Sequence, residues 1–293
     1  GTNSLYIGTS KDGVWYLSDY TNPSSQWELL NTNLPHTAVV DLEIFECGNL
    51  LRAGIFGRGM WECPLVKQSP LVISQGITEW TTPMIQNKNV IIEAGATLKI
   101  TSDIYFATDA TVIVKRGGQL IVEGLYAKLS NLCGLRWPGI QVWGNSNVPQ
   151  NSANIAEFGK VIVRNGGTIE NAETGITTMK IDEQGNWDWN YSGGIVQCTN
   201  ANFINNWHDV GFLGYANHNT FGNEMITQSY FTLTNFITNQ SFNYKEYGRP
   251  DWHVTIDNSS GIRFKGCTFK NESTQAPTDY TGPIYEWGGG GIY

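Results

Sequence analysis

Charged side chains are scarce in this sequence, and basic ones are scarcer than acidic ones. Charged residues make up 15% of the 293 positions, with 18 basic against 26 acidic side chains and a net charge of −8. Because nucleic acid is attracted by a basic field, it is not expected as a partner. The chain also lacks an apolar run of the roughly 18 residues that cross a bilayer, so we predict no membrane insertion.

Cysteine is rare as well. The chain holds five cysteines, an odd number, and none stands in a Cys-x-x-Cys pair near paired histidines, so the usual spacing of a zinc site is missing. We therefore predict no metal and no cofactor. Cys47 and Cys63 are separated by a loop length that can close a disulfide in an oxidising compartment. The alternative is two small buried hydrophobic residues.

Glycine and aromatic residues are abundant, and one short phrase recurs three times. The 33 glycines and 12% aromatic residues favour many short strands joined by tight turns. The phrase has alternating apolar residues, a glycine bend and a further apolar residue, and occupies Val90–Leu98, Val112–Leu120 and Val161–Ile169. Gly95 and Gly117 are 22 residues apart, and Gly166 follows after 49, which we interpret as one repeat plus an inserted excursion. Such spacing predicts an all-β solenoid in which Leu98 lies over Leu120.

A second repeat follows in the C-terminal half. Phe203, Phe236 and Phe269 are separated by 33 residues each time, and each lies in an Asn-rich phrase. Stacked phenylalanines inside and stacked asparagines at a corner are typical of a parallel β-helix, because asparagine tolerates the left-handed conformation of such turns.

The phrases of this half carry a resemblance. Trp137–Val142 (WPGIQV) and Gly167–Ile176 (GTIENAETGI) resemble recurrent phrases of the right-handed parallel β-helix domains found in secreted, type IX-exported bacterial surface proteins. The resemblance implies a β-helix over residues 89–293 and a secreted or cell-surface location. The chain ends in the strand-like Gly288–Tyr293, which predicts a domain that is incomplete at its C-terminus.

Residues 1–65 follow a different pattern. Four strand-like segments meet through short turns, about one propeller blade: Leu5–Asp19 (a hairpin), Trp27–Pro35, Val39–Glu46 and Leu51–Glu62. Ser10–Trp15 resembles a shortened Asp-box, and Asp41–Glu62 resembles the last repeat of BNR or sialidase-like propellers. We therefore predict a propeller-blade-like segment over 1–65 and, from its prolines, a connection over 66–88.

An enzymatic function is the less favoured of two hypotheses. Many parallel β-helices cleave acidic polysaccharides, but the paired aspartates and the Gly-His-Gly and Arg-Ile-Lys phrases of pectinase-type hydrolases are missing here. Trp207–Asp209 and Arg249–His253 are the densest polar and aromatic clusters, and a histidine beside an aspartate can act as a general base. The alternative is that both clusters simply cover the strands. We predict no catalytic residue, and keep a polysaccharide lyase or glycoside hydrolase as the alternative.

The favoured hypothesis is a non-catalytic, adhesin-like stalk that binds glycans or other surface or secretion-machinery proteins. The strands of a solenoid repeat, so specific binding residues are expected in the loops between them. The longest polar and aromatic loops here are Asp182–Tyr191, Trp207–Asn219 and Tyr244–His253. Stacked on one another, these predict a single sugar-gripping face composed of Trp187, Trp189, Trp207, Asp209, Arg249, Trp252 and His253. The alternative for Trp187 and Trp189 is a loop packed back on the wall. The oligomeric state is not predicted.

Overall fold

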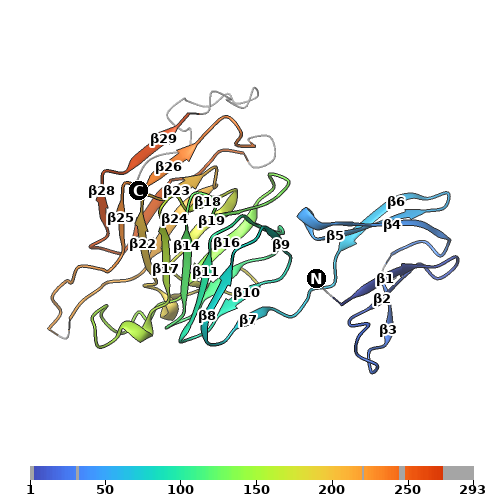
Figure 1. Cartoon of the computed structure of the whole chain (residues 1–293), viewed down its shortest axis with the longest axis horizontal. Coiled ribbons are helices and arrows are strands. Elements are labelled where there is room, and N and C mark those ends of the chain that lie inside the picture. The colour runs from blue at the N-terminus through green and yellow to red at the C-terminus, as the bar shows by residue number, and fades with distance from the viewer. Residues whose placement is uncertain (1–2, 31–32, 220, 244–247, 273–293) are drawn as a thin grey trace. The chain divides into compact units, whose positions relative to one another are not determined.

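Short strands make up nearly all of the regular secondary structure in the described residues, as Figure 1 shows. The structure, a computed structural model, describes residues 3–30, 33–219, 221–243 and 248–272. The chain divides into two units, residues 1–67 and 68–293. The strand predicted at Gly288–Tyr293 and the start of the excursion at Tyr244 lie outside the described residues.

In its described residues, the second unit contains three parallel sheets of seven strands each, which fits the predicted all-β, solenoid-like fold. Sheet 1 consists of β7 (Leu71–Ile73), β10 (Val90–Ile92), β13 (Val112–Val114), β16 (Trp137–Val142), β19 (Ala172–Thr177), β24 (His208–Leu213) and β27 (Val254–Asp257). Sheet 2 consists of β8 (Gly76–Trp80), β11 (Ala96–Ile100), β14 (Gln119–Glu123), β17 (Lys160–Arg164), β22 (Ile195–Thr199), β25 (Tyr230–Thr232) and β28 (Arg263–Lys265). Sheet 3 consists of β9 (Met84–Gln86), β12 (Ile104–Phe106), β15 (Lys128–Ser130), β18 (Thr168–Glu170), β23 (Asn202–Ile204), β26 (Asn235–Thr238) and β29 (Thr268–Asn271).

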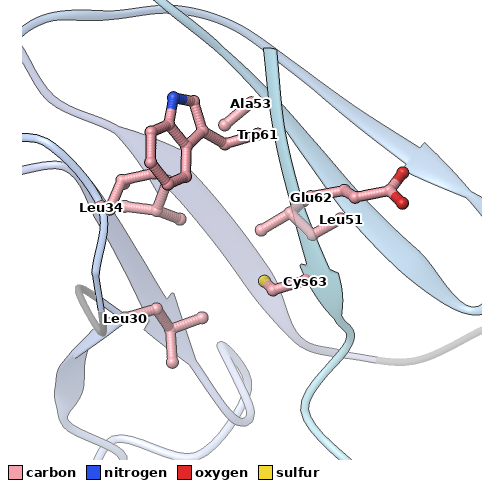
Figure 2. A pocket seen from close by; sticks show the side chains of 8 residues that line it. Leu30, Leu34, Leu51, Ala53, Trp61, Glu62 and Cys63 are labelled. Atoms are coloured by element: carbon pink, nitrogen blue, oxygen red, sulfur yellow. The ribbon is translucent and has the colours of Figure 1, made fainter. Parts of the chain in front are cut away.

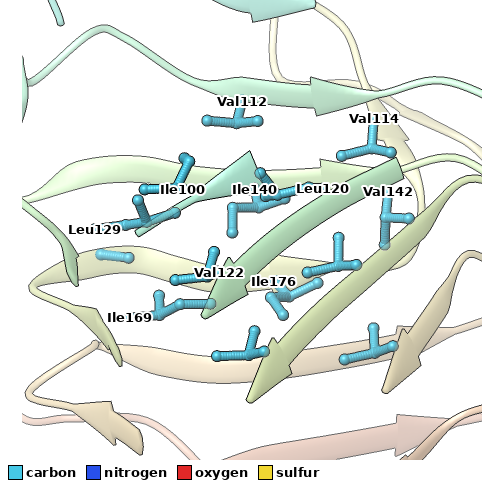
Figure 3. Close-up of a cluster of buried hydrophobic side chains, with 14 of the residues drawn as sticks. Ile100, Val112, Val114, Leu120, Val122, Leu129, Ile140, Val142, Ile169 and Ile176 are labelled. Atoms are coloured by element: carbon cyan, nitrogen blue, oxygen red, sulfur yellow. The ribbon is translucent and has the colours of Figure 1, made fainter. Parts of the chain in front are cut away.

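The chain visits sheets 1, 2 and 3 in turn, and we call each such set of three strands a rung. Equivalent residues of neighbouring rungs pair directly, so Leu98 lies over Leu120 as predicted. Phe203, Phe236 and Phe269 also form the predicted column, with ring centroids 5.1 Å and 4.7 Å apart. Side chains that point inward are buried between the three sheets, and Figure 3 shows part of this core.

One predicted alignment is wrong. Val161 pairs with Leu120 in sheet 2, whereas Val90 and Val112 pair with each other in sheet 1. The third copy of the phrase is therefore shifted by one sheet. Its bend at Gly166 lies at the corner between sheets 2 and 3, while Gly95 and Gly117 lie between sheets 1 and 2. Similar local sequences suit both corners, because both need a tight turn between two half-buried strands.

The stretch predicted as a connection, residues 66–88, contains the first rung. Its strands β7, β8 and β9 pair with β10, β11 and β12. Pro70 and Pro83 come immediately before β7 and β9, where no ladder N–H is required. The prolines therefore mark strand starts in this segment.

Within residues 3–30 and 33–67, the first unit contains six strands in two antiparallel sheets, where four strand-like segments were predicted. One sheet orders β1 (Leu5–Gly8), β2 (Val14–Leu17) and β3 (Trp27–Leu30); the other orders β4 (Val39–Phe45), β5 (Leu50–Ile55) and β6 (Gly59–Pro64), with the 3₁₀ turn η1 (Glu46–Gly48) between β4 and β5. The predicted hairpin Leu5–Asp19 is present as β1 and β2. Leu51–Glu62 is split between β5 and β6, because Gly57 and Gly59 adopt φ of 67° and 78° and reverse the chain.

Left-handed residues stack at the corner between sheets 2 and 3. The residue after each of five consecutive sheet-2 strands has a positive φ: Gly124, Asn165, Asn200, Leu233 and Gly266. Glycine and asparagine tolerate this region, whereas another L-residue loses about 1–2 kcal/mol in it. Leu233, with φ of 50° and a side chain 59% exposed, is the exception in the column.

We expect Leu233→Asn to stabilise the protein. Asparagine fits the left-handed corner as Asn200 does on the rung before, so the free energy of unfolding should rise by about 1 kcal/mol. Urea unfolding measures the change. Leu132→Asn is the matched control, because Leu132 is also an exposed leucine (52%) but has no positive φ. An equal effect of both substitutions would mean that backbone strain at residue 233 is not the cause.

Candidate functional site

Trp187 and Trp189 lie on a loop that leaves the corner between sheets 1 and 2. The loop contains the two-stranded β20 (Lys180–Ile181) and β21 (Trp187–Asp188), followed by the 3₁₀ turn η3 (Trp189–Tyr191). The Asp182 carboxylate closes its tip by accepting the N–H groups of Gln184 and Asn186 at 2.9 and 2.8 Å and the Asn186 side-chain amide at 3.0 Å. These hydrogen bonds, that of the Asn186 side chain first, lower the pKa of Asp182.

The base of this loop is fixed by cations stacked on an aromatic ring. The Arg116 guanidinium and the Lys180 ammonium both stack on the Tyr191 ring, 4.2 Å and 4.6 Å from its centroid, and Trp143 meets the ring edge-on at 5.2 Å. Arg116 also donates to the carbonyls of Gly144 at 2.7 Å and Asn190 at 2.8 Å. The loop is therefore tied to the neighbouring rungs through side chains as well as backbone.

The two indoles at the top of the loop are half exposed. Trp187 is 50% and Trp189 48% exposed, and their rings are 5.8 Å apart and inclined by 64°. A Cβ atom added to Gly214 would meet the Trp189 ring at 2.4 Å, so the indole rests directly on the backbone that follows β24. Trp189 is positioned by this contact, and Trp187 extends beyond it.

Asp209 and His253 form a pair in the core and not on the surface, which corrects the predicted sugar-gripping face. Asp209 is 1% and His253 4% exposed, and Oδ2 of Asp209 lies 2.6 Å from Nδ1 of His253. The other carboxylate oxygen accepts the Asn206 side-chain amide at 2.7 Å. The backbone explains the burial: the N–H groups of Asp209 and Val210 both point to the His253 carbonyl, an irregularity that turns Asp209 inward.

The far side of His253 faces aromatic rings. Phe236 and Phe269 lie 6.3 and 6.2 Å from its ring centroid, and Nε2 is buried without a hydrogen-bond partner. A substrate in solvent cannot reach either member of the pair. The pair therefore lies inside the fold, and neither Asp209 nor His253 is available at the surface as the general base considered from the sequence. The other histidine of these clusters, His208, lies 3.5 Å from the Asp251 carboxylate.

The remaining predicted residues surround the entry to β24 and β27. The Trp207 indole donates to the Arg249 carbonyl at 2.7 Å, and Trp252 is 39% exposed. Trp187 and Trp189 follow β19 and rest near the end of β24, whereas Trp207 precedes β24 and Trp252 precedes β27. β24 has six residues, which puts about 20 Å between its two ends. The residues of the single continuous face predicted from the sequence thus lie at opposite ends of the sheet-1 strands.

A polar cluster on the outer wall of sheet 3 was missed in the sequence. Tyr105, Ser130 and Glu170 occupy one column on successive rungs. Tyr105 donates to Asp103 at 3.2 Å, Ser130 donates to Glu170 at 3.2 Å, and Lys128 lies 3.4 Å from Glu170. The signal that could have found this cluster is the register itself, since it puts residues 105, 130 and 170 side by side despite unequal spacing.

The pKa values of two members of this cluster, Tyr105 and Lys128, lie above their usual values. Burial, followed by the charge of Asp103, raises the pKa of Tyr105. Burial alone lowers the pKa of Lys128, but Glu170 and its neighbours outweigh it and raise that pKa overall. Neither side chain is therefore free to accept a proton near neutral pH, as an eliminating base must.

The first unit contains a small apolar hollow. Its volume is about 60 Å³, and it is lined by Val14, Leu30, Leu34, Leu51, Ala53, Trp61, Glu62 and Cys63, most of which Figure 2 labels. Cys63 is a free thiol whose pKa is raised by burial. The predicted Cys47–Cys63 disulfide is therefore wrong: β6 turns Cys63 toward the hollow, while Cys47 is buried in η1.

Among the described residues, no three His, Cys, Asp or Glu side chains are grouped to hold a metal ion. No helix in this part of the chain has the length and apolar character that a membrane span requires. Comparison with known proteins gives no relative: no family model, no curated protein and no solved structure matches the chain.

We expect Asp209→Ala to destabilise the protein by about 3 kcal/mol, because it leaves the buried Asn206 amide and His253 ring without their acceptor. Asp209→Asn keeps an acceptor for Asn206 and should cost less. Thermal unfolding of both variants measures the difference. A loss below about 1 kcal/mol for the alanine variant would contradict the buried pair.

Stability should also fall in mild acid. Burial lowers the pKa of His208, against the opposing charges of Asp251 and Asp209; its ring nitrogens face Val210 and Asp251. Because the folded pKa lies below the unfolded value of about 6.5, the unfolded state binds the proton first. The contribution of His208 to the free energy of unfolding is therefore fully present above pH ~6.5, and it is lost as the pH falls through the folded pKa. His208→Gln should reduce the dependence of the free energy of unfolding on pH, which urea titrations between neutral and acidic pH measure. An unchanged pH dependence would show that other groups cause it.

Proposed function

We propose that this protein is a non-catalytic, secreted or cell-surface module that binds glycans through Trp187 and Trp189. The observation that carries the proposal is a pair of half-exposed indoles at an angle, held on a braced loop. Flat apolar rings stack on the C–H faces of sugars, and a rigid platform loses little entropy when a ligand binds.

The proposed architecture is a right-handed parallel β-helix that acts as a stalk. Three sheets visited in turn, with apolar columns inside and asparagine ladders at the corners, support it. An example of a ladder is Asn235, which donates to Asn202 at 3.0 Å. The first unit is proposed to be the last repeat of a BNR or sialidase-like propeller, which its antiparallel sheets and Gly57–Trp61 turn support. Both features agree with the resemblance to exported surface proteins.

A polysaccharide lyase or glycoside hydrolase is the second candidate. The cluster of Asp103, Tyr105, Lys128 and Glu170 on neighbouring rungs favours it, because β-helix enzymes need such groups on one wall. The raised pKa values of Tyr105 and Lys128 argue against a base at this place. Release of unsaturated or reducing ends from a polysaccharide panel, abolished by Lys128→Ala, would favour the enzyme.

The binding proposal predicts that Trp187→Ala/Trp189→Ala loses glycan retention at least about tenfold, since stacking of two aromatic rings is worth a few kcal/mol. Immobilised glycans and a soluble competitor measure retention. Leu125→Ala/Tyr126→Ala is the matched control, because both side chains are even more exposed, at 80% and 82%, but lie at a different corner. Equal loss in both variants would refute a specific site, and a lack of retention by the wild type on every glycan would refute the function.

A further inference from the structure

The charged groups around the two indoles are mostly negative. The loop that carries Trp187 and Trp189 also carries Asp182, Glu183 and Asp188, against one cation, Lys180. Hydrogen bonds from its own turn lower the pKa of Asp182, so that carboxylate stays ionised. Glu183 and Asp188 lie within four residues of Trp187, and the antiparallel pairing of Ile181 with Trp187 and of Lys180 with Asp188 brings Asp182 and Lys180 near it as well, inside the Debye length of about 8–10 Å.

The two nearby cations already serve the loop itself. Lys180 lies 3.4 Å from the Asp188 carboxylate and over the Tyr191 ring. Arg116 also stacks on the Tyr191 ring and donates to two backbone carbonyls. Gripping a carboxylate or sulfate with either of them would break the contacts that brace the platform. Acidic sugars are normally bound by fork-like arginine donors, and Arg116 already uses its Nε and Nη2 groups for the Gly144 and Asn190 carbonyls.

The position of Trp189 depends on a residue without a side chain. Gly214 has φ of 60°, and any Cβ there would overlap the Trp189 ring. Gly222 has a similar φ of 79° but no atom near a would-be Cβ. The two glycines therefore form a matched pair: alanine strains the backbone at both, and displaces the indole at only one.

We infer that the Trp187–Trp189 site selects uncharged hexose glycans and rejects glycans that carry carboxylate or sulfate groups; this rests on the proposed glycan-binding function. Stacking supplies the attraction, and the carboxylates of the loop repel an acidic chain. The ligand is thus the opposite of the acidic polymers on which the alternative enzymatic function would act.

Calorimetric titration of the whole chain with two oligosaccharides of equal length, a neutral β-glucan oligomer and an oligogalacturonate, tests the inference. The neutral oligomer should bind at least about tenfold more tightly, with little dependence on salt. Glu183→Lys should narrow this gap by improving binding of the acidic oligomer, whereas Asp109→Lys, an equal charge change between β12 and β13, should not. Gly214→Ala should weaken binding of the neutral oligomer, and Gly222→Ala should leave it unchanged.

The outcomes separate the two proposals. Tighter, salt-sensitive binding of the oligogalacturonate through Trp187 and Trp189 would overturn the charge selection and leave the glycan-binding function standing. Binding of neither oligomer by the wild type, together with no retention on any glycan of the panel, would overturn the function itself. If Gly214→Ala and Gly222→Ala weakened binding of the neutral oligomer equally, the contact between Trp189 and Gly214 would have no specific role in binding.

Discussion

Parallel backbone pairing in strict register is the constraint on which the second unit depends. Because each rung repeats the position of the one before, any side chain has a near copy about 4.8 Å away. An inward column must therefore be apolar or internally satisfied along its whole length. Leu98 over Leu120 meets the first condition, and the Asp209 carboxylate, whose two oxygens pair with His253 and Asn206, meets the second. The corner columns obey the same logic, since one left-handed position recurs on every rung from Gly124 to Gly266.

The same constraint decides what the sequence could reveal. The 22- and 33-residue spacings predicted Leu98 over Leu120 and the phenylalanine column, because each of these spacings spans one whole rung. Val161 was misplaced, because the excursion before β17 changes the spacing without changing the local phrase. Asp209 and His253 were expected outside, since alternation along β24 gives no sign of the irregularity that turns Asp209 inward. The cluster of Tyr105, Ser130 and Glu170 depends on pairing between distant residues and has no local signature.

The proposed binding residues lie in loops outside the paired strands. Excursions leave the rungs at corners, and those between sheets 1 and 2 form a small core of their own from Phe158, Ile195 and Tyr215. Gln150 and Asn217 tie them together, with Gln150 donating to the Gly193 carbonyl at 2.7 Å and Asn217 accepting its N–H at 3.0 Å. This packing explains how a polar, aromatic loop can hold Trp187 and Trp189 in a defined orientation. The buried Asp209–His253 pair, by contrast, stabilises the interior at the other edge of sheet 1.

We propose that the ligand binds at one corner of the fold, between sheets 1 and 2, and not along a continuous face. The most direct measurement follows the indole N–H resonances of the 11 tryptophans while a neutral β-glucan oligomer is added. The account predicts that the signals of Trp187 and Trp189 shift to saturation, while those of Trp207 and Trp252 stay in place. Movement of the Trp207 and Trp252 signals, or no movement of any indole at saturating oligomer, would contradict it.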